Sequence, residues 1–388
     1  MTDISQQGVV ILGSTGSVGT STLSVIDALP DRFRVVGLAA RSDTDLLQQQ
    51  IDTFQPTYAH IHNDQRITGA KQLAGDDALM QLATLDEADI VVVATTGHTA
   101  IEPTIAALRA GKIVALANKE TIVAAGEIVM RTAREGPGVL RTVDSEHSAI
   151  WQCLGEDRFD PQRVRRLILT ASGGPFRGWT ADQLSSVTPA DALKHPTWTM
   201  GSKITVDSAT LMNKGLEIIE AHWLFDCPLD AIDVIVHPQS IVHSFVEFLD
   251  GSLMAQLASH DMRVPIQYAL TYPDRVEGAG APLDLASMLE LTFEPPDPDA
   301  FPLLRIAREA AEHGSTYPTV LSAADSVAVE AFLEGKLSFP GIARLVVATL
   351  ERHSPASGPL TLEAIHAADA WAIEQARALL QSEASQWN

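Results

Sequence analysis

The stretch GVVILGSTGSVG, from Gly8 to Gly19, places a short apolar run directly before glycines at positions 13, 16 and 19. Such a run is typical of a buried parallel strand. Glycines at this spacing allow a tight turn, close approach of a pyrophosphate and close packing of the next helix. An amphipathic segment to about Leu29 and a second apolar run, Arg34–Ala40, follow. The pattern predicts a dinucleotide-binding strand–loop–helix unit, with a glycine-rich turn that binds nothing as the alternative.

Apolar runs and helical segments alternate through the rest of the first third of the chain. Strands that alternate with helices predict a doubly wound parallel sheet of the Rossmann type. The expected strands are 58–63, 89–95, 112–118 and 139–143, and the expected helices are 101–110 and 119–135. Asn118, Lys119 and Glu120 then lie at the carboxyl end of a strand, the edge at which such sheets bind ligands. A polar strand-to-helix turn is the alternative for these three residues.

The residues after the second strand bear on the choice between NAD and NADP. An acidic residue there binds the ribose 2′-hydroxyl of NAD, whereas a cationic residue accommodates the 2′-phosphate of NADP. Here the strand ends in Ala39-Ala40-Arg41-Ser42. We therefore expect NADPH, with Arg41 and Ser42 as its readers. Asp43 or Asp45 would be the acidic residue if the strand ended two residues later.

The strand at 139–143 runs into Asp144, Ser145, Glu146 and His147. If this segment stays extended, Asp144 and Glu146 face the same side while Ser145 points elsewhere. Two neighbouring carboxylates repel each other unless a cation or a proton intervenes. With Glu217 as a third ligand the set is all oxygen, which suits Mg²⁺ or Mn²⁺. A solvated acidic surface is the alternative.

The segment DSATLMNKGLEIIE, Asp207–Glu220, combines hydroxyl, amide, ammonium and carboxylate groups where a helix is expected to begin. Helical spacing places Asn213 and Lys214 on the same face as Glu217. Ser208 and Thr210 are expected near the helix start, where unpaired backbone N–H groups favour anions. Ser208, Asn213 and Lys214 could hold a phosphate, and Glu217 could face a cation. An ordinary N-capped helix is the alternative.

Two polar loops lie between these motifs. SGGPF follows an apolar run and places Ser172 where it can donate to an anion. KHPTWTMGSK, residues 194–203, mixes imidazole, indole, thioether and ammonium groups with Pro196 and Gly201. That composition favours a mobile flap with an amphipathic closing surface over a plain surface loop. Its candidate contact residues are His195, Trp198 and Met200.

Two later segments each add one candidate. HPQSIVHS contains His243, and DMRVPIQYAL contains Met262. A single histidine on an apolar strand is more often part of the core than of a catalytic site.

The rest of the chain sets the domain organisation. At 388 residues the chain exceeds what one core usually carries. We expect a Rossmann-like domain (1–143), a central α+β catalytic domain (144–280) with the flap at about 194–203, a linker (281–301) and a helical bundle (302–388). The bundle follows from helical apolar spacing after Pro302.

Composition limits the classes of partner and the compartment. The formal net charge of −22 argues against nucleic acid binding. Of only seven lysines, Lys119, Lys194, Lys203 and Lys214 fall in the polar motifs. The two cysteines show neither metal-ligand spacing nor a disulfide framework, which fits a reducing compartment. Only seven residues precede the first expected strand, and the apolar runs are too short to span a bilayer, so a cytoplasmic protein is expected.

Taken in order, these motifs resemble those of the 1-deoxy-D-xylulose 5-phosphate reductoisomerase family. They read GSTGSVG, ALANKE, VDSEHSAI, SGGPF, HPTWTMGSKITVDSATLMNKGLEIIEA, HPQSIVHS and DMRVPIQYAL, across residues 13–270. The resemblance implies NADPH- and metal-dependent rearrangement and reduction of 1-deoxy-D-xylulose 5-phosphate to 2-C-methyl-D-erythritol 4-phosphate, a step of the non-mevalonate isoprenoid pathway. It also implies a homodimer.

The resemblance further implies roles for individual positions. The metal ligands would be Asp144, Glu146 and Glu217. The substrate phosphate would be held by Ser172, Ser208, Asn213 and Lys214, and the rest of the sugar by Ser145, Glu146, Lys119 and His195, with Trp198 and Met200 on the flap and His243 and Met262 in or beside the site. NADPH would be contacted by Gly13, Thr15, Gly16, Ser17, Val18, Arg41, Ser42, Asn118, Glu120 and Gly201. We expect Lys119, Glu146 and His195 to act in catalysis, with the general acid or base left open between Lys119 and a metal-bound water.

Two departures from the family pattern stand out. Arg41-Ser42 replaces a Lys-Asn pair, so the 2′-phosphate contacts differ in detail. Ser322–Ser326 replaces Asn-Ala-Ala-Asn-Glu, which we interpret as a packing change without chemical consequence. Two alternatives to the family function remain: a related NADPH-dependent sugar-phosphate or aldehyde reductase without the rearrangement, and a non-catalytic NADPH-binding protein.

Overall fold

The computed structural model describes residues 6–63, 65–155, 158–198, 200–284, 286 and 290–382. The predicted domain ranges and the predicted flap also include residues outside this described part, Thr199 of the flap among them. The chain divides into two compact units. The first comprises the described residues up to Thr121, Val129–Ser148 and Asp261–Pro282, and the second comprises Ile122–Ile128, Ala149–His260 and the residues from Leu283 on. Each unit is described by itself.

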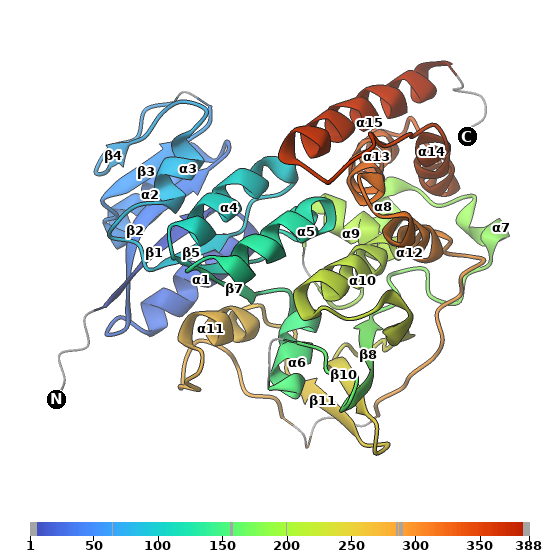
Figure 1. The fold of residues 1–388 in the computed structure, drawn as a ribbon, viewed down its shortest axis with the longest axis horizontal. Helices are drawn as coiled ribbons and strands as arrows, with labels where there is room; N and C mark the ends of the chain where they lie inside the picture. Colours follow the sequence, from blue (N-terminus) through green and yellow to red (C-terminus); the bar gives the residue numbers. More distant parts are fainter. Residues whose placement is uncertain are drawn as a thin grey trace. The chain divides into compact units, whose positions relative to one another are not determined.

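The first unit is built on a parallel sheet with the strand order β4-β3-β2-β1-β5-β6-β7 (Figure 1). Its strands are β1 (Gln7–Leu12), β2 (Phe33–Ala40), β3 (Tyr58–Ile61), β4 (Lys71–Gln72), β5 (Ile90–Val93), β6 (Ile113–Leu116) and β7 (Val139–Thr142). Residues Val9–Leu12 at the centre are fully buried, because a parallel sheet is covered on both faces. The predicted doubly wound sheet is confirmed.

Helices join these strands in the expected alternation. They are α1 (Ser17–Ala28), α2 (Thr44–Phe54), α3 (Ala78–Ala83), the 3₁₀ turn η1 (His98–Ala100), α4 (Ile101–Arg109) and α5 (Lys119–Glu135). Helix α11 (Arg263–Thr271) returns to the same unit, where its Ile266 and Leu270 share a core cluster with Leu23 and Ile26 of α1. Arg141 of β7 secures α11 by donating to the carbonyl of Ala269 at 2.7 Å.

The second unit contains a smaller mixed sheet with the order β11-β10-β8-β9. Its strands are β8 (Val164–Ala171), β9 (Ile232–Val236), β10 (Val242–Phe248) and β11 (Leu253–Leu257). Strand β8 pairs with β9 in parallel and with β10 in antiparallel orientation. The nearby helices are α6 (Ser145–Leu154, which begins in the first unit), α7 (Ala181–Leu184), α8 (Pro189–Ala192), α9 (Ser202–Ala209), α10 (Met212–Phe225) and the 3₁₀ turn η2 (Leu229–Ala231).

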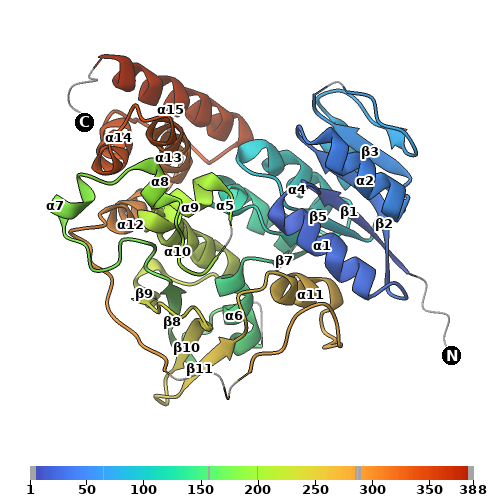
Figure 2. The same cartoon turned by 180° about the vertical axis from the view of Figure 1, so that it is seen from behind.

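The C-terminal part of the second unit is helical, as predicted. It consists of α12 (Leu303–His313), α13 (Tyr317–Leu333), α14 (Phe339–Glu351) and α15 (Leu362–Ser382), and Figure 2 shows α13, α14 and α15 gathered side by side. Helix α13 is the most enclosed of them, since it packs against α9, α12, α14 and α15. No described helix combines the length and the apolar character that crossing a membrane would require.

Candidate active site in two half-sites

The glycine loop of the first unit has the geometry of a dinucleotide cradle. Gly13 has a φ of +93°, and a Cβ there would lie 2.6 Å from the carbonyl oxygen of Ala94. A Cβ on Gly19 would lie 2.3 Å from the carbonyl oxygen of Gly13. Gly16 is the N-cap of α1, and the first turn of that helix carries no acidic residue. The bare helix N-terminus can therefore receive a phosphate, with Thr15, Ser17 and Val18 beside it.

The end of β2 supports the prediction of a cationic reader. Strand β2 ends at Ala40, so Arg41 and Ser42 are the first residues beyond it, and both are exposed. Asp43 is the N-cap of α2 and accepts the backbone N–H of Leu46 at 3.0 Å. Because the Asp43 carboxylate already caps α2, Arg41 is the better placed partner for a ligand.

Asn118 organises the carboxyl edge of β6. Its side-chain oxygen caps α5 by accepting the backbone N–H of Thr121 at 2.8 Å, and its amide donates to the carbonyls of Thr95 and Gly97. The side chain is almost fully buried. Asn118 thereby fixes the loop after β5, while Glu120 is half-buried in the first turn of α5. The prediction that both contact NADPH stays open.

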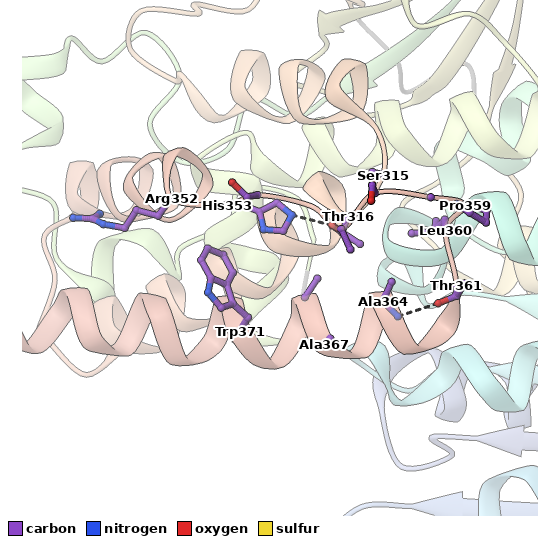
Figure 3. Close-up of a pocket in the computed structure, with 15 residues that line it drawn as sticks. Ser315, Thr316, Arg352, His353, Pro359, Leu360, Thr361, Ala364, Ala367 and Trp371 are labelled. Atoms are coloured by element: carbon purple, nitrogen blue, oxygen red, sulfur yellow. Dashed lines mark hydrogen bonds between the residues drawn. The ribbon is translucent and has the colours of Figure 1, made fainter.

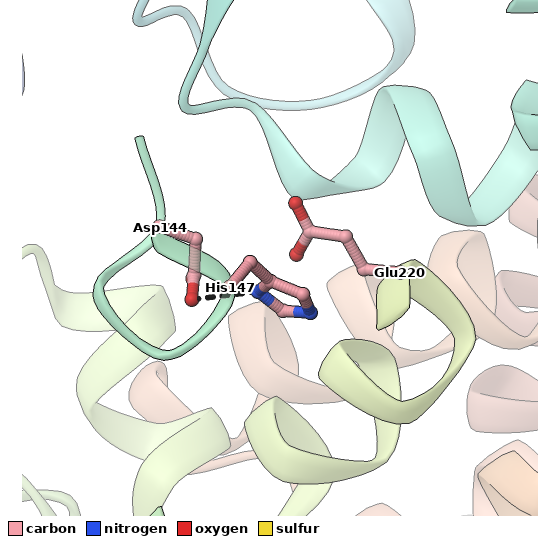
Figure 4. Close-up of side chains that lie close together, drawn as sticks. All are labelled: Asp144, His147 and Glu220. Carbon is pink, nitrogen blue, oxygen red and sulfur yellow. Dashed lines mark hydrogen bonds and ion pairs between the residues drawn. The ribbon is translucent and has the colours of Figure 1, made fainter. Parts of the chain in front are cut away.

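Asp144 connects the ends of two neighbouring strands. It follows β7, and its Oδ2 lies 3.1 Å from Nζ of Lys119, the first residue of α5 after β6. Its Oδ1 accepts a hydrogen bond from Nδ1 of the fully buried His147 at 2.8 Å, as Figure 4 shows. Sequence reasoning assigned His147 no role, although a histidine three residues after an aspartate at a helix start indicates this contact.

The turn after β7 differs from the extended segment expected there. Helix α6 begins at Ser145, and Oδ1 of Asp144 accepts the backbone N–H of Glu146 at 3.1 Å. Ser145 Oγ donates to the Glu146 carboxylate at 2.6 Å, so the expectation that Ser145 points away from it is wrong. Aspartate favours this start because its carboxylate satisfies N–H groups that the first helical turn leaves unpaired.

The first turns of α10 in the second unit carry the predicted polar face. Asn213 donates to Oε1 of Glu217 at 2.6 Å, and Lys214 forms an ion pair with its Oε2. Both Lys214 and Glu217 are buried. The i, i+3 and i, i+4 contacts expected from helical spacing are therefore confirmed, and they hold a carboxylate and an ammonium together away from bulk water.

Ser208 lies in a different element from the one expected. It belongs to the last turn of α9, because Leu211 adopts a left-handed conformation with a φ of +59° and separates α9 from α10. Thr210 does lie near the start of α10, where its Oγ1 accepts the N–H of Met212. Ser208 can therefore contact an anion through its hydroxyl. Because it lies at the end of α9, the unpaired N–H groups of a helix start are not beside it.

Ser172, His195 and Ser208 converge from three separate segments. Nε2 of His195 lies 3.0 Å from Oγ of Ser172 and 3.1 Å from Oγ of Ser208. Its Nδ1 accepts the backbone N–H of Trp198 at 2.9 Å, so the ring proton of the neutral form is on Nε2. Burial, together with His260, lowers the pKa of His195 to about 4. The cluster is thus an uncharged set of donors, suited to an anion.

Gly174 keeps this cluster compact. Its φ is +65°, and a Cβ there would lie 2.9 Å from the carbonyl oxygen of Ser208. The Ser-Gly-Gly turn therefore packs directly on the end of α9 because it lacks side chains at this point.

Trp198 of the predicted flap lies against His243 of β10 and His260 of the loop after β11. The Trp198 ring centroid is 5.6 Å from that of His260 and 6.3 Å from that of His243. His243 is buried on β10, and burial with the nearby His260 lowers its pKa to about 4. Met200 is half-buried, and Gly201 is the exposed N-cap of α9. Met262 belongs to the first unit, where it packs against the sheet core.

The structure gives the changed segment Ser322–Ser326 a specific packing contact. Asp325 on α13 is fully buried and forms an ion pair of 2.7 Å with Lys203 of α9. Sequence reasoning missed this contact because the two residues are far apart in the chain.

A cavity of about 620 Å³ in the helical bundle lies outside this set of residues (Figure 3). It lies beside Thr316, whose Oγ1 is 2.8 Å from His353 Nε2, and against Trp371 of α15. None of the predicted site residues lines it.

The parallel sheet, its strand order and its glycine loop define the class: an α/β protein of the dinucleotide-binding type. Three family models match the chain, described as 1-deoxy-D-xylulose 5-phosphate reductoisomerase over residues 9–126, its C-terminal domain over 140–225, and a DXP reductoisomerase C-terminal domain over 257–375. The chain belongs to the 1-deoxy-D-xylulose 5-phosphate reductoisomerase family.

Curated relatives of that name are similar over nearly their whole length. The protein of Thermomicrobium roseum is 54% identical over 376 residues, which cover 96% of this chain and 97% of the relative. The protein of Pelotomaculum thermopropionicum is 53% identical over 377 residues, covering 94% of this chain and 96% of the relative.

Solved structures of the family superpose closely. The Zymomonas mobilis reductoisomerase in complex with NADPH is 41% identical, with 97% of this chain and 100% of that chain covered and a TM-score of 0.88. A DOX-P reductoisomerase in complex with NADPH, fosmidomycin and magnesium is 37% identical, with 98% and 100% covered and a TM-score of 0.92.

Proposed function

We propose that this protein converts 1-deoxy-D-xylulose 5-phosphate to 2-C-methyl-D-erythritol 4-phosphate with NADPH and a divalent metal, a step of the non-mevalonate isoprenoid pathway. Family membership and neighbours solved with NADPH and magnesium support the activity and its cofactors. The observation in this chain that carries the proposal is the convergence of Ser172, His195 and Ser208 on an uncharged donor cluster. Such a cluster fits a small phosphorylated substrate.

The substrate phosphate is bound by the two serines of this cluster together with Asn213 and Lys214, and His195 beside them contacts the rest of the sugar. In the structure the two serine hydroxyl oxygens share the Nε2–H of His195 as acceptors. An incoming phosphate oxygen offers these same groups a stronger, charge-assisted acceptor. Phosphate binding, remote from the reacting carbons, then holds the sugar in register. Closure of the flap through Trp198 and Met200 keeps water from the site.

Asp144, Glu146 and Glu217 are the proposed metal ligands. All their donor atoms are carboxylate oxygens, which fits Mg²⁺ or Mn²⁺. When bound, the ion supplies Lewis-acid stabilisation of negative charge on the substrate oxygens. Neighbouring side chains orient two of these carboxylates. His147 and Lys119 hold that of Asp144, and Asn213 and Lys214 hold that of Glu217.

The glycine loop and the end of β2 are the proposed NADPH site. The fit rests on Gly13 and Gly19, where a Cβ would collide with the backbone of the loop, and on Gly16 as the N-cap of α1. The Ser14 hydroxyl in this loop is buried and has no hydrogen-bond partner among the described residues. NADPH supplies the hydride. Gly13, Thr15, Gly16, Ser17 and Val18 face the phosphates of the dinucleotide. Arg41 and Ser42 contact the 2′-phosphate, and Asn118, Glu120 and Gly201 contact the rest of the cofactor.

Proposed roles for the other site residues follow the same logic. Lys119, Glu146 and His195 act on the reacting part of the sugar, with Lys119 the protein's own candidate for proton transfer. Ser145 contacts a sugar hydroxyl, and His243 and Met262 line the site. The division into a Rossmann-like domain (1–143), a catalytic domain (144–280), a linker (281–301) and a helical bundle (302–388) remains part of the proposal, as does a cytoplasmic location.

A homodimer is proposed from one exposed strand. Strand β11 is an edge of its sheet, and its Leu253 and Met254 side chains are about half exposed, at 51% and 49%. An uncovered apolar edge strand is a ready surface for pairing with another chain. A second copy covers this edge. Sedimentation should show a dimer that Leu253→Lys converts to a monomer, and an unchanged dimer would place the interface elsewhere.

The carbon skeleton of the product tests the reaction. The protein is incubated with 1-deoxy-D-xylulose 5-phosphate, NADPH and Mg²⁺, and the product is examined by carbon-13 NMR. A branched methyl-erythritol phosphate is expected. A linear reduced sugar phosphate would establish the simple reductase, and NADPH binding without any product would favour the non-catalytic alternative.

A further inference from the structure

Lys203 is shared by two buried carboxylates within the second unit. Its Nζ lies 2.6 Å from Oδ2 of Asp207 and 2.7 Å from Oδ2 of Asp325. Lys203 and Asp207 belong to the first and last turns of α9, whereas Asp325 belongs to α13 of the helical bundle. The contact therefore links the bundle to the helix that carries Ser208.

This arrangement fixes the position of α9. A fully buried carboxylate such as that of Asp325 is tolerated only with a close partner. Its other oxygen, Oδ1, has no hydrogen-bond partner in the part of the chain that the structure describes. The carboxylate of Asp325 is therefore held by Lys203, and any displacement of α9 would separate the two charges.

Helix α9 lies between the flap and the anion cluster. Its N-cap is Gly201 of the flap, and its last turn presents Ser208 to His195 at 3.1 Å. At that same end the carbonyl of Ser208 is packed against Gly174. A shift of α9 would therefore move the Ser208 hydroxyl relative to Ser172 and would also move the attachment point of the flap.

We propose that Asp325 is a positioning residue for the substrate phosphate: it holds Lys203, and Lys203 holds α9 so that Ser208 meets the phosphate. The inference rests on the proposed function in that Ser208 is taken as a phosphate ligand. It gives the helical bundle a part in substrate affinity although Asp325 itself does not touch the substrate.

The direction in which phosphate affinity changes when the Asp325 carboxylate is removed distinguishes a positioning role from a purely electrostatic one. Coulomb's law alone predicts that removing the Asp325 carboxylate strengthens the binding of an anion nearby. Loss of position predicts the opposite, because misplacing one donor weakens every contact that depends on its geometry. Glu330 on the same helix provides the matched control, because its carboxylate is exposed and lies 3.8 Å from the guanidinium of Arg377.

The experiment compares Asp325→Ala, Asp325→Asn and Glu330→Ala with the unaltered protein. It measures KM and kcat for 1-deoxy-D-xylulose 5-phosphate, the dissociation constant for inorganic phosphate by calorimetry, and that for NADPH by fluorescence. Asp325→Ala should raise KM and the phosphate dissociation constant about tenfold, with kcat and NADPH binding nearly unchanged. Asp325→Asn should lie between, and Glu330→Ala should match the unaltered protein.

Tighter or unchanged phosphate binding in Asp325→Ala would overturn the inference, as would an equal loss of kcat and NADPH binding. If Asp325→Ala does not fold, Asp325→Asn, which keeps the side-chain volume, is judged by the same two criteria. The calorimetric arm does not depend on turnover. An unaltered protein that is inactive would refute the proposed function alone, while the change in phosphate affinity would still decide the role of Asp325.

Discussion

Nζ of Lys119 lies 3.1 Å from Oδ2 of Asp144, although 25 residues separate them in the chain. The two residues follow β6 and β7, which are neighbours in the parallel sheet, so their side chains meet at its carboxyl edge. Both are largely buried. The ammonium therefore stabilises the carboxylate of one of the proposed metal ligands.

Replacing Lys119 should affect the chemical step more than cofactor binding. Lys119→Met removes the ammonium but keeps the length of the side chain. We expect kcat to fall about a hundredfold or more, the scale of general acid–base catalysis, while the NADPH dissociation constant stays nearly constant. Steady-state kinetics and NADPH fluorescence measure the two. Unchanged kcat would remove Lys119 from the catalytic residues, and the exposed Lys336→Met serves as the control.

Arg41 should discriminate between the two nicotinamide cofactors. It is the first residue beyond β2 and is exposed, so Arg41→Ala costs no core packing. Loss of a charge-assisted contact with the 2′-phosphate should weaken NADPH about tenfold or more and leave NADH unaffected. Asp43→Ala, which removes the α2 cap, should change both affinities alike. An equal effect of Arg41→Ala on both cofactors would contradict its role as the reader.

Burial of His243 makes stability depend on pH in a defined direction. Its pKa is lowered from 6.5 to about 4, so the unfolded chain binds the proton more tightly than the folded one. The free energy of unfolding is therefore highest above about pH 6.5, where His243 is neutral in both states. It falls by about 3 kcal/mol as the pH drops towards 4. Denaturant unfolding across this range measures it. The slope of the free energy of unfolding against pH should shrink in His243→Gln and persist in the exposed His366→Gln. An unchanged slope in His243→Gln would show that His243 is not the group responsible.

Glu217→Gln tests the metal site while keeping the side-chain volume and the hydrogen bond from Asn213. Loss of one anionic ligand should lower Mg²⁺-dependent turnover by at least about a hundredfold, with NADPH binding retained. Partial recovery at high Mn²⁺ would support a weakened site. Full activity at low Mg²⁺ would exclude Glu217 as a ligand. Glu309→Gln, which alters an exposed ion pair on α12, should leave turnover unchanged.

Features with a local cause could be predicted from the sequence. Helix α5 runs from Lys119 to Glu135 as expected, because apolar periodicity and the Asn118 cap both mark its start. The face shared by Asn213, Lys214 and Glu217 follows from helical spacing alone. The doubly wound parallel sheet follows from the alternation of strands and helices, because parallel neighbours need a crossover connection.

Features that depend on distant contacts could not be predicted in this way. The break at Leu211, which moves Ser208 into a separate helix, requires a left-handed residue where a leucine is not expected. Packing of α11 against α1 joins segments more than two hundred residues apart, and no local pattern marks it. The ion pair between Lys203 and Asp325 likewise depends on how α9 meets α13, so the sequence motif alone suggested only packing.

Consumption of NADPH with 1-deoxy-D-xylulose 5-phosphate, followed by absorbance with Mg²⁺ and then with EDTA, tests the central claim most directly. The account predicts steady, substrate-dependent oxidation of NADPH that stops when EDTA is added and resumes when Mg²⁺ is restored in excess. A folded protein that binds NADPH but oxidises none of it with this substrate, or that continues unchanged in EDTA, would contradict the account.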